Sequence, residues 1–214
     1  MDFNGHFSAH VPSGRSLMIN AADSVRSRIG AHDLIDIDID IDIDFDFEER
    51  PFAVDRTPPM EFHLQSQIYL RRSDVHAIVH THPRCSTMLS TMGQTWQPVT
   101  MQATVLGPVP VLKKTASINS VVLDLEVAEF LDGAKAVLMR RHGDVTVAAS
   151  VSDAFGLAIY LEENAHRQYL GPQIGTPQAL NEEEFGVIGR NLSPPVLLQK
   201  VWTYHVGKNF PVGL

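Results

Sequence analysis

The sequence predicts an α/β protein, with a three-layer α/β/α sandwich around a central, mostly antiparallel sheet. Two observations indicate this fold class. Residues 3–47 contain segments in which polar and non-polar side chains alternate, as they do in paired, half-buried strands. From residue 61 onward, short non-polar runs alternate with longer stretches of helical periodicity. A chain of 214 residues supports one sizeable core, so we treat residues 1–214 as a single domain.

The first two elements are predicted to form a hairpin. Residues 3–12 alternate as a strand does, and residues 16–20 provide its partner. Ser13 and Gly14 between them are typical of a tight turn.

The next strand begins a repeat in which aspartate alternates with isoleucine or phenylalanine, from Leu34 to Phe47. This period of two predicts non-polar side chains facing inward and aspartates facing solvent. Fourteen residues exceed the usual length of a strand, so we expect one bent strand or two strands. A solvated sheet face accounts for the aspartate row, and we assign no chemistry to it.

A helix is predicted over residues 61–72 and a buried strand over residues 75–79, which leads directly into His80 and His82. Side chains alternate along a strand, so these two histidines point the same way and could hold one divalent metal. The alternative is a polar pair at a strand end, with no ligand.

A third histidine occurs in a similar setting. Residues 136–139 form another short non-polar strand, which leads through two arginines to His142 and Gly143. Glycine after a histidine allows the backbone to approach whatever that histidine touches. Three histidines from two strand ends match the three protein ligands of a catalytic metal site with open positions. Glu61 on its own indicates only a favourable charge in the first turn of a helix.

The remaining elements follow from periodicity and capping signals. We predict short strands over 99–104, 109–112 and 144–149, and helices over 119–131, 150–170, 181–190 and 193–205. We expect Glu162 and Glu163 on the long helix to face outward or to meet another subunit.

Composition excludes several classes of protein. A net charge of −8 argues against nucleic acid as the main partner, because phosphate binding requires a basic surface. The sequence contains neither a non-polar run long enough to span a membrane nor a signal peptide, so we expect no membrane partner. A lone cysteine, Cys85, cannot form an intramolecular disulfide. We therefore expect a cytoplasmic protein.

Three stretches together resemble the class II aldolase/adducin family, and the resemblance extends from Phe3 to about Tyr204. They are Pro59-Met60-Glu61 with the following helix, residues 74–83 with His80 and His82, and Arg141-His142-Gly143 followed by a Glu-rich helix. The family includes sugar-phosphate aldolases, a pentulose-phosphate epimerase and aromatic-acid decarboxylases.

The resemblance implies one divalent metal ion per chain, with His80, His82 and His142 as its ligands and Glu61 as the acid/base residue. Zinc or manganese is expected, while iron and cobalt also suit this donor set. The resemblance further implies a homotetramer with sites at subunit interfaces. Family members usually carry a helix before the first strand, and we expect this chain to lack it.

Departures from the family pattern bear on the substrate. Sugar-phosphate members have a Ser-Ser pair before the glutamate, which donates hydrogen bonds to the phosphate; this chain has Pro59 and Met60. Asp23 after the second strand would repel a phosphate. The pattern that includes Gly5 and His6 is more similar to the branch that decarboxylates hydroxylated aromatic or heteroaromatic acids.

Our first hypothesis is therefore a metal-dependent lyase that decarboxylates such an acid through a stabilised enolate or phenolate. The alternatives are an aldolase or epimerase acting on a small hydroxy-carbonyl compound or a sugar phosphate, and a non-catalytic, adducin-like interaction module. We assign substrate contacts to His6, Asn20, Arg84 and Tyr204. We expect Tyr204 or His205 to reach a neighbouring subunit's site.

Overall fold

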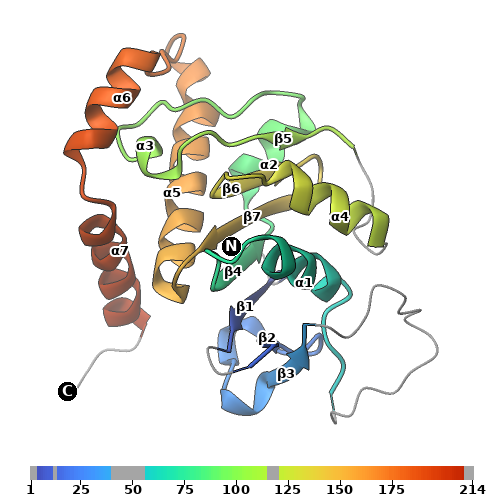
Figure 1. The fold of residues 1–214 in the computed structure, drawn as a ribbon. Helices are drawn as coiled ribbons and strands as arrows, with labels where there is room; N and C mark the ends of the chain where they lie inside the picture. The colour runs from blue at the N-terminus through green and yellow to red at the C-terminus, as the bar shows by residue number, and fades with distance from the viewer. Residues whose placement is uncertain (1–3, 12–13, 40–55, 115–120, 210–214) are drawn as a thin grey trace.

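The fold is built on one seven-stranded sheet with the strand order β3-β2-β1-β4-β7-β6-β5 (Figure 1). The structure is a computed structural model, and it describes residues 4–11, 14–39, 56–114 and 121–209. The strands are β1 (His6–His10), β2 (Ser16–Asn20), β3 (Leu34–Asp38), β4 (Ala77–Thr81), β5 (Val111–Leu112), β6 (Ala136–Met139) and β7 (Gly143–Ala148).

The predicted central sheet is present, but it is mixed. Strand β5 runs parallel to β6, whereas the pairs β1–β2, β1–β4, β2–β3, β4–β7 and β6–β7 are antiparallel. A parallel pair needs a crossover connection, and helix α4 (Val121–Phe130) provides it between β5 and β6. The prediction of a mostly antiparallel sheet therefore did not include the parallel pairing of β5 with β6.

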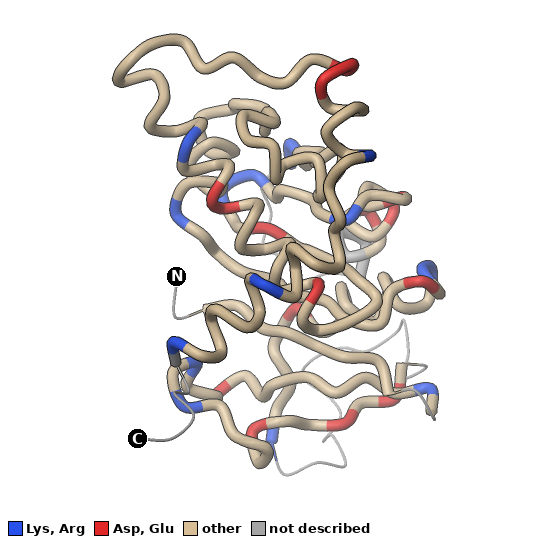
Figure 2. The backbone as a smooth tube through the Cα atoms, turned by 90° about the vertical axis from the view of Figure 1, so that its left-hand side faces the viewer, with Lys and Arg blue, Asp and Glu red and all other residues tan. Residues whose placement is uncertain are grey.

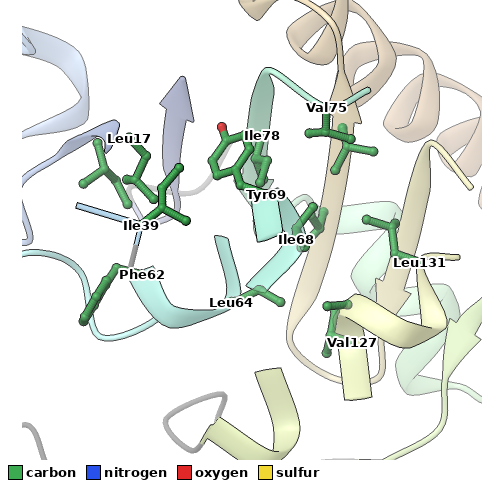
Figure 3. Close-up of a cluster of buried hydrophobic side chains, with 14 of the residues drawn as sticks. Leu17, Ile39, Phe62, Leu64, Ile68, Tyr69, Val75, Ile78, Val127 and Leu131 are labelled. Carbon is green, nitrogen blue, oxygen red and sulfur yellow. The ribbon is translucent and has the colours of Figure 1, made fainter. Parts of the chain in front are cut away.

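Helices cover both faces of the sheet. Helix α1 (Phe62–Arg71) and α4 bury non-polar side chains against one face, and Figure 3 shows Ile68, Val127 and Leu131 pointing toward one another there. On the other face lie α2 (Arg84–Thr91), α3 (Ala103–Leu106), α5 (Val151–Leu170) and α7 (Pro194–Asn209). Helix α6 (Glu182–Asn191) precedes α7.

The described part of the isoleucine–aspartate repeat confirms the alternation. Ile35 and Ile37 are buried, whereas Asp36 and Asp38 are exposed on β3. Strand β3 ends at Asp38, and the rest of the predicted strand, from residue 40 to residue 47, lies outside the described residues. The turn residue Ser13 also lies outside them.

The strand predicted over residues 99–104 is wrong. Residues 99–102 form no strand, and Ala103 already belongs to α3. The reason is tertiary: the side-chain oxygen of Asn164 on α5 accepts hydrogen bonds from the backbone of Val99 (3.0 Å) and Thr100 (3.1 Å). A side chain therefore satisfies backbone groups that the prediction assigned to a sheet.

The helical predictions agree with the structure to within a few residues at each end. Ser150 caps α5 by accepting a hydrogen bond from the Asp153 amide, as its spacing predicted. None of the helices in the described ranges is both long enough and non-polar enough to span a membrane. Lys and Arg positions are interspersed with Asp and Glu positions along the described chain (Figure 2).

Candidate metal centre

Four side chains from three separate stretches of the sequence meet at one point of the fold. Glu61 precedes α1, His80 lies in β4, His82 follows that strand, and His142 lies in the turn between β6 and β7. One possible ligand atom from each side chain lies within 4.8 Å of all the others. The structure therefore brings together all four residues that the sequence singled out.

The carboxylate of Glu61 lies among the imidazoles. Its Oε1 is 2.8 Å from His142 Nε2, and its Oε2 is 3.1 Å from His80 Nε2. Burial raises the pKa of Glu61, but hydrogen bonds from His142 and His80 outweigh it, so the pKa lies well below its ordinary value. Glu61 is therefore an ionised carboxylate, able to accept a proton or to bind a cation.

The tautomer of His80 shows that this donor set fits a metal ion. His80 is fully buried, and its Nδ1 lies 2.7 Å from the backbone oxygen of Asp144, a distance at which the ring N–H donates to the carbonyl. This contact leaves Nε2 as the ring nitrogen that would bind a metal, which requires a lone pair there, and Nε2 lies 2.9 Å from His82 Nε2. Imidazole nitrogens and a carboxylate oxygen are ligands that zinc, manganese, iron and cobalt accept.

Asp144 supports the candidate metal centre through its side chain as well as its backbone carbonyl. Its carboxylate accepts hydrogen bonds from Thr81 Oγ1 (2.7 Å) and Ser86 Oγ (3.3 Å), so it connects β7 to β4 and α2. Burial outweighs these hydrogen bonds, which favour the ionised form, and with the nearby charge of Glu162 it raises the pKa of Asp144 to about 7. Supporting groups of this kind orient the imidazoles of a metal site.

Glu162 does not face outward, which corrects the prediction. Its Oε1 and Oε2 accept hydrogen bonds from the backbone amides of Cys85 and Ser86, each at 2.9 Å. Helix α2 starts directly after His82-Pro83, and it has no side-chain cap at Pro83. Glu162 on α5 therefore satisfies two free amides of the helix that follows a predicted ligand.

Gly143 allows the two strand ends to approach each other. A Cβ atom at this position would overlap the backbone oxygen of Thr81 and would lie 2.7 Å from Cδ2 of His82. Glycine after His142 therefore permits the close approach that the sequence predicted, and the group approached is the end of β4.

The four residues assigned to substrate contacts occupy different environments. His6 is buried beside the cluster, with its Nδ1 3.7 Å from Glu61 Oε2. Asn20 is fully buried and hydrogen-bonds to backbone groups of Phe7 (2.9 Å) and Ala21 (3.2 Å). Arg84 and Tyr204 are exposed.

A cavity of about 460 Å³ adjoins the cluster. His6 and His80 line it, together with Arg26, Phe155 and Glu162. Neither Arg84 nor Tyr204 lines this cavity, whereas His205, the neighbour of the tyrosine, does. Sequence reasoning missed Arg26, Asp144 and Glu162, because no local pattern shows that they approach the histidines.

Comparison with known proteins places the chain in a family. Residues 1–169 match the class II aldolase and adducin N-terminal domain. A 5-methylthioribulose-1-phosphate/5-deoxyribulose-1-phosphate aldolase of Rhodospirillum rubrum is 28% identical over 130 residues, which cover 60% of this chain and 59% of that protein. The decarboxylase NovR of Streptomyces niveus is 27% identical over 143 residues, covering 64% of this chain and 51% of that protein.

The fold is also found in solved structures. An aldolase II superfamily protein from Pseudomonas syringae superposes with a TM-score of 0.78 at 21% identity, over 97% of this chain and 83% of the other. The chain spans about 59% and 51% of the two curated relatives named above. The match over residues 1–169 nevertheless covers most of the sequence, and the chain therefore belongs to the class II aldolase and adducin N-terminal domain family.

Proposed function

We propose that this protein is a metal-dependent carbon–carbon lyase. The observation that carries the proposal is the convergence of Glu61 with His80, His82 and His142, whose possible ligand atoms lie within 4.8 Å of one another. An interaction module needs no such cluster. The three histidines would hold one divalent metal, with zinc or manganese as the proposed ion.

A metal ion bound there would supply Lewis-acid stabilisation of the anion that forms when a carbon–carbon bond breaks. Glu61 is the proposed acid/base residue, because its ionised carboxylate lies within the cluster. It would take a proton from a substrate hydroxyl and return it to the carbon that loses the carboxylate. The Asp144 carbonyl holds the His80 ring in one orientation while this happens.

The proposed reaction is decarboxylation of a hydroxylated aromatic or heteroaromatic acid. Two features support it: the adjoining cavity has non-polar walls that include Phe7 and Phe155, and Pro59 and Met60 lack the hydroxyl donors of the phosphosugar pattern. The similarity to the decarboxylase NovR agrees with this assignment.

Cleavage of a sugar phosphate is the second candidate. It is favoured by the similarity to the methylthioribulose-phosphate aldolase. The charge of Asp23, which argued against a phosphate, is paired with Arg56 at 2.6 Å and therefore repels an anion less than its position in the sequence indicates.

The first test is elemental analysis of purified wild type, His80→Ala and His76→Ala. We expect about one divalent metal per chain in wild type, as three ligands plus a carboxylate imply. His80→Ala should lose it, whereas His76→Ala is a matched control, because that histidine is exposed just before the same strand. Absence of metal from folded wild type, or equal metal in His80→Ala, would contradict the proposal.

The second test separates the two reactions. Metal-loaded wild type and Glu61→Gln are assayed for carbon dioxide release from hydroxybenzoates and for aldol cleavage of ribulose 1-phosphate derivatives. We expect carbon dioxide release, reduced on the order of 10²- to 10⁴-fold in Glu61→Gln because the acid/base group is lost. Aldol cleavage alone would favour the second candidate.

A further inference from the structure

The cavity beside the metal centre has mostly non-polar walls. Its volume of about 460 Å³ lies within the range of small-molecule sites in proteins. Its lining includes Phe7 of β1, Val79 of β4, Ile29 between β2 and β3, and Phe155 and Ile159 of α5. Such walls exclude water and favour a ligand with a non-polar body.

Arg26 is the exception, as the one lysine or arginine among the residues that line the cavity. It belongs to the short 3-10 helix Arg26–Arg28, and its Nη1 donates to the backbone oxygen of Ser24 at 3.2 Å. Its Nε is buried and has no hydrogen-bond partner. Burial lowers the pKa of Arg26, which shows that the guanidinium is partly removed from water.

The acidic groups of the same cavity are already engaged. Glu162 accepts hydrogen bonds from the amides of Cys85 and Ser86, and Glu163 pairs with Arg167 at 2.6 Å. Among the described residues, no carboxylate pairs with Arg26. A partly desolvated guanidinium without a counter-ion indicates an anionic ligand, since a buried charge is costly unless it is paired.

The cavity and the metal centre share two residues. His6 and His80 line the cavity, and both also approach Glu61, at 3.7 Å and 3.1 Å. Nε2 of His6 is buried without a partner, so a second polar group at this border is available to a ligand. A molecule in the cavity would therefore lie next to the proposed acid/base residue.

We propose that this cavity binds a small carboxylic acid with a non-polar, ring-sized body, whose carboxylate pairs with Arg26. The inference rests on the proposed function for its catalytic meaning, because it identifies the substrate class of that site. A guanidinium matches a carboxylate through two parallel hydrogen bonds. One arginine balances one negative charge, whereas a phosphate monoester carries nearly two and needs more donors than these walls supply.

The test is isothermal titration calorimetry in the presence of a chelator, so that no metal contributes to binding. The probes are 4-hydroxybenzoate, phenol and inorganic phosphate, and the proteins are wild type, Arg26→Met and Arg28→Met. Arg28 is the matched control, since it belongs to the same short helix but is exposed and does not line the cavity. We expect wild type to bind 4-hydroxybenzoate at least about tenfold more tightly than phenol, and phosphate more weakly than 4-hydroxybenzoate.

Arg26→Met should lose this preference for 4-hydroxybenzoate and keep its affinity for phenol, whereas Arg28→Met should behave as wild type. The inference is overturned if Arg26→Met binds 4-hydroxybenzoate as wild type does, or if wild type binds phenol or phosphate equally well. If Arg26→Met does not fold, equal binding of phenol and 4-hydroxybenzoate by wild type would still overturn the inference. The titration contains no metal, so its failure would contradict this inference without affecting the metal-content test. If 4-hydroxybenzoate binds as expected but the protein lacks metal or turnover, only the proposed function is contradicted.

Discussion

His80 shows how a single buried residue connects the sheet to the metal centre. Its side chain is fully buried, so both ring nitrogens require partners. The backbone of β7 provides one through Asp144, and Glu61 provides the other. The imidazole orientation is therefore determined before any ligand binds, as a preorganised site requires.

A second single residue, Asp33, lies outside the candidate metal centre and leads to a prediction about stability at low pH. Its carboxylate accepts a hydrogen bond from the Gly30 amide at 2.8 Å and pairs with Arg56 at 2.6 Å, and these contacts lower its pKa from 3.8 to about 2. A carboxyl whose pKa is lower in the folded state stabilises the protein above its unfolded pKa. That contribution should disappear as the pH falls from about 4 to about 2.

The measurement is urea denaturation of wild type and Asp33→Asn between pH 2 and pH 6. Asp33→Asn should be less stable than wild type at pH 6, and the difference should shrink toward pH 2. Asp36→Asn, on the exposed side of β3, serves as a control that should follow wild type. Equal stability of wild type and Asp33→Asn at pH 6 would refute the assignment.

At the scale of elements, the position of α2 depends on α5. Helix α2 lacks a side-chain cap of its own, and the Glu162 carboxylate of α5 accepts its Cys85 and Ser86 amides. His82 lies in the short connection between β4 and α2. The sheet fixes one end of this connection, and the contact with Glu162 fixes the other. Residues that support metal ligands in this way typically change metal affinity 10- to 100-fold when mutated, on the order of 1–3 kcal/mol.

We therefore expect Glu162→Gln to weaken metal binding by about tenfold, because an amide can accept only one of the two hydrogen bonds. Metal affinity is measured by competition with a chelator, and the absorption spectrum of the cobalt-substituted protein reports ligand geometry. Glu163→Gln is the matched control, since that neighbour pairs with Arg167 on the exposed side. Unchanged affinity and an unchanged cobalt spectrum in Glu162→Gln would show that the contact serves only the fold.

At the scale of the whole molecule, the sheet order assembles the metal centre. Strand β4 lies between β1 and β7, so His80 is opposite His6 on one side and opposite Val145 on the other. The turn before β7 then delivers His142, and α1 delivers Glu61 from the adjacent face. Segments separated by more than sixty residues meet because the central strands are antiparallel neighbours.

The family resemblance leads us to propose that whole molecules of this protein assemble into a homotetramer. Met88 on α2 and Met92 directly after its end are 45% and 68% exposed, which is typical of a surface that meets another subunit. Light scattering after size exclusion should give four times the 23.7 kDa mass of the chain. Met92→Glu should lower that mass without unfolding the protein, and a wild-type mass of 23.7 kDa would contradict the proposal.

The sequence by itself determined the elements whose causes are local. Period-two alternation identified β2 and the described part of β3, and the serine and aspartate spacing identified the start of α5. The histidine pair after a buried strand and the His-Gly pair after another indicated a metal site, because strand geometry fixes which side chains share a face, and the family resemblance added Glu61.

Tertiary structure decided what depends on contacts distant in sequence. The side-chain oxygen of Asn164 accepts the backbone amides of Val99 and Thr100, where a strand was predicted, Glu162 points to the start of α2, and β5 pairs in parallel with β6. Arg26 gained its place in the cavity in the same way. Hydrogen-bond partners and counter-ions are chosen among all groups that the fold brings within reach, and a local pattern contains no information about them.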